Sequence, residues 1–381
     1  MLELQKFILD NPDWHERLTD KPFCLHTQST KLLNGDSYVL FKYDQRNSSF
    51  ESPIVREARG VILRIKPDRT SKIVRFFTKK FFNIGEPLAA KLDYSSAVGY
   101  EKWDGTLVSL WFDEGAWNIS TLGNLDIFDA PLNSGGYKNF GELFYEAKKK
   151  YKFDFDKLDK NLCYSLELCS PFNQIVVLYD DFHLIHLNTV DCSTLEEVER
   201  DIGLPKPKEY SFASKEDYRN LVSTFDSTHE GIVVRDKFNN RIKIKSELYF
   251  SLHLMAANGQ LTKVKAMNLI LHNEVAEFVS YFPKQLPFIH SVELEYAAAK
   301  SKAFEVNNSV AKWKAENPTC GRAEFSNWVC KNCQGWSHIA YLAYADLFMS
   351  RFQERLTTAL TDETNGGVKE FMRFLSMGVN N

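Results

Sequence analysis

The chain has 381 residues, enough for two to three ordinary domains or for one large domain with an appendage. Hydrophobic residues make up 44% and charged residues 25%, which argues against a disordered or fibrous class. The 47 basic and 50 acidic side chains leave a formal charge of -3, so no overall cationic field attracts nucleic acid. Any contact with nucleic acid must therefore come from a local patch.

The first residues of the chain, its apolar stretches and its cysteines bear on the cellular compartment of the protein. Residues 1–12 are polar and acidic, and no uninterrupted apolar stretch approaches membrane length. Seven cysteines fit reduced thiols better than a disulfide framework. We therefore expect a cytoplasmic protein, and its size predicts a monomer.

Short strands broken by turns are expected from about Ser37 to Phe250. Strands are predicted, among others, over residues 37–43, 60–65, 108–112 and 231–235. Two helices are expected to interrupt them, over residues 141–150 and 194–201, and Pro205 and Pro207 mark a loop after the second.

Beyond about Leu254 the pattern becomes helical. Apolar residues recur three and four apart at Ile289, Val292, Tyr296, Ala299, Ala303, Val306, Val310 and Trp313. Pro283 and Pro287 precede this helix and Pro318 follows it, and further helices are expected over residues 338–360 and 368–375. The sequence thus predicts an α+β chain, with a mixed, sheet-rich domain over residues 1–253 and an all-α domain over residues 254–381.

Lys102 is the first candidate functional residue, in the segment Glu-Lys-Trp-Asp-Gly of residues 101–105. It is expected at the end of one strand, before a glycine turn into the next. A neutral lysine amine is a good nucleophile, but its ordinary pKa of about 10.4 must be lowered by neighbouring cations or desolvation. By itself, K-x-D-G is also an ordinary β-turn sequence.

A second pattern alternates cations with isoleucine. Arg241, Lys243 and Lys245 would share one face of a strand, and Ile242 and Ile244 the other. The charged face would fit a triphosphate, although an amphipathic strand with a solvated basic side has the same pattern.

Two carboxylates, Glu167 and Glu230, lie in otherwise apolar strands. Burial there costs free energy unless a metal ion, a ribose hydroxyl or a lysine pairs with the carboxylate. The alternative is an edge strand that turns these side chains to water. Basic residues also lead into a strand over residues 56–61 and occur in the segment 79–83.

Together these segments resemble the lysine-dependent nucleotidyltransferases. The motifs occur in the order Arg59-Gly60, Lys80-Phe81-Phe82-Asn83, Lys102 to Gly105, Glu167, Glu230-Gly231 and Lys243 to Lys245. The Lys-Phe-Phe-Asn segment, with Pro-Phe-Asn-Gln-Ile-Val at residues 171–176, is similar more narrowly to the phage-type ATP-dependent RNA ligases that join single-stranded RNA. The resemblance implies a mixed or antiparallel-sheet, ATP-grasp-like nucleotidyltransferase domain that serves as the adenylyltransferase.

The resemblance also implies a reaction. Lys102 would attack the α-phosphorus of ATP to form lysyl-AMP and release pyrophosphate. AMP would pass to an RNA 5′-phosphate, and an RNA 3′-hydroxyl would then displace it. Alignment and charge neutralisation, with Mg²⁺, would drive these displacements. The expected role is RNA or tRNA repair.

Residue roles follow from the same resemblance. Catalytic roles are implied for Lys102, Lys243 and Lys245. Binding of ATP is implied for Arg59, Lys80, Glu101, Lys102, Glu167, Leu187, Glu230, Val233, Lys243 and Lys245. Within this set Glu230 and Glu167 would hold the metal, and Leu187 and Val233 would cover the adenine unless they are ordinary core residues. One departure is that residues 117–123 carry no lysine where some relatives have one, which puts one phosphate or metal contact in doubt.

Two other functions share part of the pattern. DNA ligases and capping enzymes have the lysine motif, but a small β-barrel typically follows it, whereas the pattern here is helical. A non-catalytic RNA-end binding protein would be expected to lose Lys102 or Glu230, and both are present.

The helical domain leaves two questions open. Cys320, Cys330, Cys333 and His338 have the ligand types of a zinc site, although cysteine is also often a buried apolar residue. Aromatic and basic residues of this domain could either contact RNA or build its core: Trp313, Lys314, Arg322, Trp328, Lys331 and Trp336.

Overall fold

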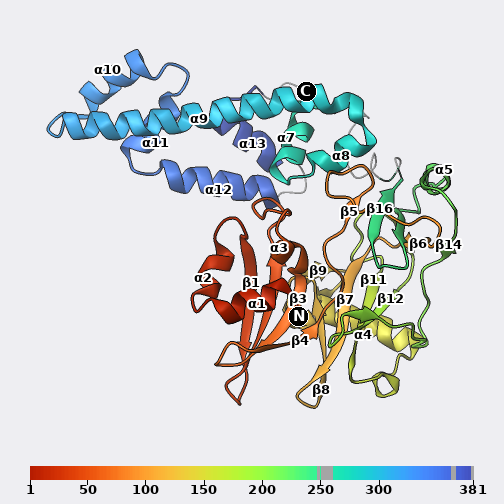
Figure 1. The fold of residues 1–381 in the computed structure, drawn as a ribbon. Coiled ribbons are helices and arrows are strands. Elements are labelled where there is room, and N and C mark those ends of the chain that lie inside the picture. Colours follow the sequence, from red (N-terminus) through yellow and green to blue (C-terminus); the bar gives the residue numbers. More distant parts are fainter. Residues whose placement is uncertain (247–248, 250–260, 362–365, 379–381) are drawn as a thin grey trace. The chain divides into compact units, whose positions relative to one another are not determined.

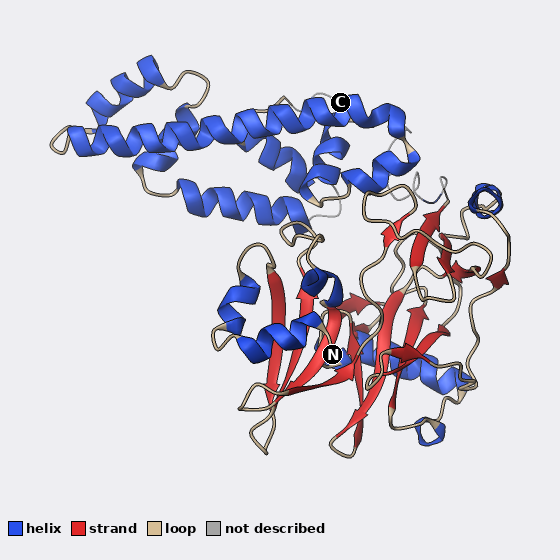
Figure 2. Ribbon diagram, viewed as in Figure 1, coloured by secondary structure: helices blue, strands red, loops and turns tan. Residues whose placement is uncertain are grey.

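The computed structural model describes residues 1–246, 249, 261–361 and 366–378 (Figure 1). The chain separates into two compact units, Met1–Ala256 and Ala257–Asn381. Strands dominate the first unit, and the described part of the second is helical (Figure 2). The expected change of pattern at about Leu254, and the end of the strand-rich stretch at Phe250, lie outside the described residues.

The strands of the first unit form three larger sheets and one hairpin among the described residues. The amino-terminal sheet has the order β1 (Leu25–Lys31), β2 (Ser37–Tyr43), β3 (Arg59–Ile65) and β4 (Ser71–Arg75). The central sheet has the order β13 (Glu196–Glu197), β12 (His183–Asp191), β11 (Leu162–Cys169), β7 (Thr106–Asp113) and β8 (Ala116–Thr121). The lysine sheet, named for Lys102, has the order β14 (Glu209–Tyr210), β6 (Val98–Lys102), β15 (Gly231–Arg235), β16 (Arg241–Lys245) and β5 (Phe82–Asn83). The hairpin is β9 (Pro131–Ser134) with β10 (Tyr137–Asn139).

Neighbouring strands in the larger sheets run antiparallel, except that β16 pairs with β5 in parallel. The helical elements of this unit are α1 (Glu3–Asp10), α2 (Trp14–Thr19), α3 (Pro53–Glu57), α4 (Phe140–Tyr151) and α5 (Lys215–Ser223), with short 3₁₀ turns at Ile127–Asp129 and Phe155–Lys157.

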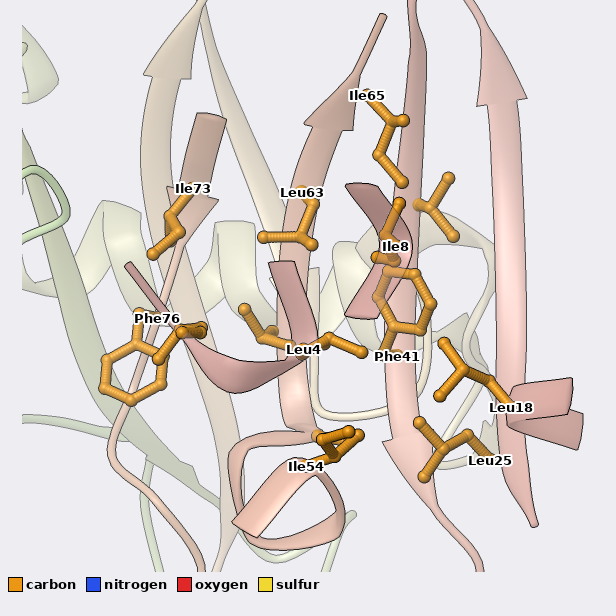
Figure 3. Packing of buried hydrophobic residues seen from close by; sticks show 14 of the residues in the cluster. Leu4, Ile8, Leu18, Leu25, Phe41, Ile54, Leu63, Ile65, Ile73 and Phe76 are labelled. Carbon is orange, nitrogen blue, oxygen red and sulfur yellow. The ribbon is translucent and has the colours of Figure 1, made fainter. Parts of the chain in front are cut away.

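Apolar residues on the faces of the sheets form the cores of this unit. On α1, Leu4 and Ile8 are four residues apart and so share one side, which packs against Phe41 of β2 (Figure 3). In the lysine sheet, Ile242 and Ile244 are buried against the side of the sheet that α5 covers with Tyr218. The opposite face of β16 therefore carries the cations, as the alternating pattern predicts.

Most predicted strands and helices of the first unit are confirmed. β2 and β15 have the predicted bounds, β3 begins one residue earlier, β7 extends beyond the predicted strand at both ends, and α4 covers the first predicted helix. The helix predicted over residues 194–201 is wrong. Glu197 instead pairs with Val190 of β12 and forms ion pairs with Arg235 and Arg241, and these tertiary contacts override a local preference for helix.

The described part of the second unit consists of helices and one short 3₁₀ turn, Pro283–Gln285. The helices are α7 (Lys263–Leu271), α8 (Val275–Tyr281), α9 (Leu286–Glu316), α10 (Arg322–Asn332), α11 (Ser337–Tyr344), α12 (Phe348–Thr361) and α13 (Gly366–Phe374). α9 confirms the long predicted helix, and it buries Ile289, Val292, Ala303, Val306, Val310 and Trp313. Pro287 lies in its first turn rather than before it, a position where proline loses no intrahelical hydrogen bond. No helix in the described ranges is long and apolar enough to cross a membrane.

The aromatic residues at one end of α9 form a core. The Trp313 ring lies 5.1 Å from that of Phe325 and 5.9 Å from that of Trp328, and Phe325 stacks on Tyr344 at 4.1 Å. Trp313 is only 8% exposed. Trp313 therefore belongs to the core, whereas Trp328 and Trp336 are half-buried and Arg322 and Lys331 are exposed.

The cysteine cluster of this unit is not assembled as a metal site. His338 contacts the Phe374 carbonyl oxygen through Nε2 at 2.8 Å, and the thiol of Cys320 faces Asn317. Within the described ranges, no three His, Cys, Asp or Glu side chains are grouped so as to hold a metal ion.

Candidate active site

Lys102 is the last residue of β6, and the following turn leads directly into β7. This turn lies close against β11, because a Cβ atom on Gly105 would come within 2.4 Å of the Leu168 carbonyl oxygen. Glycine at this position therefore lets the K-x-D-G turn approach the strand that carries Glu167.

Lys102 and Lys245 share one buried carboxylate. Lys102 Nζ donates a short hydrogen bond to Glu230 Oε2, and Lys245 Nζ lies 3.7 Å from Glu230 Oε1. The Glu230 side chain is 3% exposed, whereas those of Lys102 and Lys245 are 26% and 17% exposed. A carboxylate this deeply buried needs charged partners, and the two lysines supply them.

Strand register produces this arrangement. Gly231 of β15 lies opposite Lys102 of β6 on one side and Lys245 of β16 on the other, so these residues form one row across the sheet. Gly231 has a φ of +152°, and a Cβ there would meet the Ile244 carbonyl oxygen at 2.2 Å. Any other residue would push β15 and β16 apart next to Glu230.

Hydrogen bonds of the Asp104 side chain and backbone hold the K-x-D-G turn in place. Its Oδ2 accepts hydrogen bonds from the backbone N–H groups of Val176 and Val177, each at 2.8 Å, and its Oδ1 accepts one from the Tyr249 hydroxyl at 2.9 Å. The Asp104 N–H also donates to the Tyr179 hydroxyl at 3.0 Å. Asp104 is 3% exposed, so its role is to fix the turn rather than to meet a ligand.

A cavity of about 600 Å³ opens beside Lys102. All three larger sheets contribute to its lining: Lys42 and Arg59 from the amino-terminal sheet, Leu107, Ser165, Glu167 and Leu187 from the central sheet, and Tyr100, Lys102, Val233, Arg235 and Arg241 from the lysine sheet. This volume lies within the range of small-molecule sites, roughly 300–1,000 Å³.

Glu167 lines this cavity, and its pKa is higher than the ordinary value for glutamate. Burial raises its pKa to about 7, Lys102 opposes that rise, and the negative charge of Glu230 adds to it. Nearby, burial lowers the pKa of the Arg59 guanidinium, whose Nη1 donates to Thr78 Oγ1 at 2.7 Å.

The other residues predicted for ATP binding divide into two groups. Glu101, Leu187 and Val233 line the cavity. Lys80 does not: its ammonium lies over the rings of Tyr43, Phe50 and Phe82 at 5.2, 5.3 and 5.7 Å. Glu230, Lys243 and Lys245 also lie outside the lining. Glu230 and Lys245 connect to it through Lys102, and Lys243 Nζ lies 5.8 Å from the centre of the Phe81 ring, which lines the cavity.

Sequence reasoning missed several residues of the site. Tyr249 holds Asp104 from four positions beyond Lys245, and no local pattern marks it. Glu197 also lines the cavity and connects Arg235 with Arg241, so Arg241 of the basic strand face is already paired with a carboxylate. The misassigned helix over residues 194–201 concealed this contact.

The raised pKa of Glu167 predicts a pH-dependent stability. The unfolded chain releases this proton near the ordinary value of 4.5, but the folded chain holds it until about pH 7, so the free energy of unfolding falls as pH rises between these values. The glutamine of Glu167→Gln is uncharged at every pH, so this variant does not lose stability in this way as pH rises. In thermal denaturation of the ligand-free protein, the melting temperature of Glu167→Gln should therefore rise relative to wild type from about pH 5 to about pH 7.5. Glu146→Gln, at an exposed position of α4, is the control, and a difference that is constant with pH for Glu167→Gln contradicts the prediction.

Known proteins with related sequences include two viral ones. An RNA ligase of Rhodothermus phage RM378 is 28% identical over 313 residues, which cover 64% of this chain and 70% of that protein. A candidate bifunctional polynucleotide kinase/RNA ligase of Autographa californica nuclear polyhedrosis virus is 26% identical over 327 residues. That match covers 80% of this chain but 44% of the baculovirus protein, so the chain spans less than half of that relative.

Among solved structures, an archaeal ATP-dependent RNA ligase aligns with a TM-score of 0.44 and 12% identity, over 96% of this chain and 87% of that chain. A score this low establishes neither a shared fold nor a shared function. The family model described as RNA ligase matches residues 57–254, which include Lys102, Glu167, Glu230 and Lys245. Since that match spans more than half of the chain, the protein belongs to the RNA ligase family.

Proposed function

We propose that this ligase uses ATP to charge Lys102 with AMP and then joins an RNA 5′-phosphate to an RNA 3′-hydroxyl. One observation carries the proposal: the Lys102 amine lines a cavity of nucleotide size and contacts a buried carboxylate and, through it, a second lysine. A lysine that only stabilised the fold would not need to face a cavity of this size.

The first step forms a bond between Lys102 Nζ and the α-phosphorus of ATP and breaks the bond from that phosphorus to the pyrophosphate oxygen. Nζ must lose its protons on the way, and Glu230 Oε2 is the carboxylate oxygen that already accepts its hydrogen bond. AMP then passes to the RNA 5′-phosphate, which releases Lys102. In the last step the RNA 3′-hydroxyl attacks that phosphate and AMP leaves.

Cations around the cavity would neutralise the phosphates. Lys243 and Arg59 share the Phe81 ring, at 5.8 and 5.0 Å from its centre, and Lys245 stands beside Glu230. Fixed positive charges placed before the reaction stabilise developing negative charge without reorganisation. We assign Lys243, Lys245 and Arg59 to the phosphates on this basis.

The residues present fit Mg²⁺ held together with substrate. Glu230 and Glu167 are two carboxylates close enough to repel each other electrostatically, and no three such ligands are grouped in the described ranges. Mg²⁺ typically uses one or two carboxylates and completes its shell with water and substrate phosphates. Bound there, Mg²⁺ would offset phosphate charge and orient the leaving pyrophosphate.

Leu187 and Val233 suit the two faces of the adenine ring. They come from β12 and β15, in different sheets, and both are half-buried and line the cavity. Leu187 sits at an irregularity in the pairing of β11 with β12, where Ser165 pairs with Asn188 and Leu166 with His186. The bulge leaves Leu187 without a partner on β11.

We propose single-stranded RNA ends, such as those of a cleaved tRNA, as the substrate. Beyond β16, the residues that the structure describes contain no strand from which a duplex-clamping β-barrel could be built. We also propose a monomer in the cytoplasm, a compartment that suits the seven free thiols.

Lys102→Ala should abolish covalent AMP transfer to the protein, because the variant lacks the bonding atom. Lys243→Ala and Lys245→Ala should each slow the transfer by about two to three orders of magnitude, in proportion to the loss of one fixed charge at the phosphates. Labelled ATP followed by gel separation of the protein measures all three variants, with exposed Lys66→Ala as the control. Covalent AMP on Lys102→Ala at the wild-type level excludes Lys102 as the nucleophile.

Single-stranded RNA with a 5′-phosphate and a 3′-hydroxyl should be joined or circularised faster than the same ends at a nick in a duplex. The reason is that the described helical unit provides no barrel to clamp a duplex. Parallel ligation of both substrates at equal concentration of ends decides the point. Faster sealing of the nick would overturn the proposed substrate while leaving the lysyl-AMP step untouched.

A further inference from the structure

Lys42 is a cation of the cavity to which no role has been assigned above. It is the residue before the end of β2, and it pairs in register with Arg59, the first residue of β3, next to an irregularity between Phe41 and Lys42. Both side chains line the cavity that contains Lys102. Two like charges directly opposite each other on neighbouring strands destabilise a sheet.

No carboxylate relieves this repulsion on the Lys42 side. Lys42 forms no ion pair with any residue that the structure describes, and it is half-buried. Its ammonium lies beside the turn after β8, 3.4 Å from where a Cβ atom on Gly123 would be. Residues 117–123 of that strand and turn contain no basic side chain, so Lys42 supplies the positive charge at this part of the cavity wall.

Arg59 connects Lys42 to the proposed phosphate site. Its guanidinium lies 5.0 Å from the centre of the Phe81 ring, and Lys243 Nζ approaches the same ring. Lys42 and Arg59 thus line the cavity as neighbouring cations, and Lys243 approaches from behind the Phe81 ring that Arg59 also contacts. A chain of phosphates, each with a negative charge, matches such a group of cations better than a single carboxylate does.

We propose that Lys42, opposite Arg59, forms a phosphate subsite that binds a substrate phosphate other than the one that Lys102 attacks. The proposal rests on the function proposed above, because the anion it assigns is a substrate phosphate. Two sources share this chemistry: the β- and γ-phosphates of ATP, which leave as pyrophosphate, and the 5′-phosphate of the RNA. Lys42 binds and positions the phosphate and forms no covalent bond.

The test compares Lys42→Met, which keeps the length of the side chain, with Lys42→Arg, which keeps its charge. Lys31→Met is the matched control, since Lys31 is an exposed lysine of β1 that pairs with Ser37, at the end of β2 away from Lys42. In the first arm, lysyl-AMP formation is measured against ATP concentration, and its reversal against inorganic pyrophosphate. In the second arm, purified lysyl-AMP enzyme transfers AMP to RNA with a 5′-phosphate, over a range of RNA concentrations. Melting temperatures of all variants are recorded.

If the subsite binds the phosphates of ATP, Lys42→Met raises the KM for ATP and the pyrophosphate concentration needed for reversal by about ten-fold or more, and transfer to RNA is unchanged. If it binds the RNA phosphate, lysyl-AMP forms normally and the half-saturating RNA concentration rises instead. In either case Lys42→Arg lies closer to wild type than Lys42→Met.

Two results overturn the subsite. One is that Lys42→Met matches wild type in both arms. The other is that Lys42→Met and Lys42→Arg lose every step equally together with melting temperature, which indicates a structural role. Failure of the proposed function itself is recognised separately, because wild type and Lys31→Met would then form no lysyl-AMP.

Discussion

The active site depends on one buried carboxylate placed between two lysines. Glu230 is almost fully withdrawn from water, and a carboxylate there is tolerable only because Lys102 and Lys245 approach it from the flanking strands. The register of β6, β15 and β16 places the lysines there, and glycine is necessary at position 231 because a Cβ atom would meet the Ile244 carbonyl oxygen. The same contact that stabilises the sheet holds the proposed nucleophile at the cavity.

An ammonium paired with a carboxylate is not yet a nucleophile, however. The proposed reaction therefore requires that Glu230 move away from Lys102 or take its proton when ATP binds.

The K-x-D-G motif divides these tasks between its residues. Lys102 faces the cavity, whereas Asp104 is buried and accepts three hydrogen bonds that tie the turn to residues 176–177 and to Tyr249. Gly105 allows the turn to lie against β11. The turn is therefore held from three directions, and the amine is pre-positioned without help from ligand. Such pre-organisation is what an in-line displacement requires of a protein that contributes mainly alignment and charge.

Local patterns in the sequence were sufficient to predict individual strands and helices. The alternation of Arg241 to Lys245 predicted a strand with isoleucine buried on one face, and the three-and-four spacing from Ile289 predicted α9. The prediction failed where distant residues decide the outcome. Glu197 pairs with arginines far along the chain, which made a strand of a segment that reads as a helix. Tyr249 and Lys42 escaped notice for the same reason, since Tyr249 contacts Asp104 in the turn after β6 and Lys42 lies opposite Arg59 of β3. The ammonium of Lys80, grouped with the phosphate contacts by its motif, lies among aromatic rings.

The amine beside Glu230 is the proposed carrier of AMP, and the position of the adduct in the chain can be determined. The purified protein is incubated with ATP and Mg²⁺, digested, and sequenced by tandem mass spectrometry to find the modified lysine. We expect AMP on Lys102, with Lys243 and Lys245 unmodified. Covalent AMP on Lys243 or Lys245 instead, with Lys102 unmodified, would contradict it and assign the pairing of Lys102 with Glu230 to stability alone.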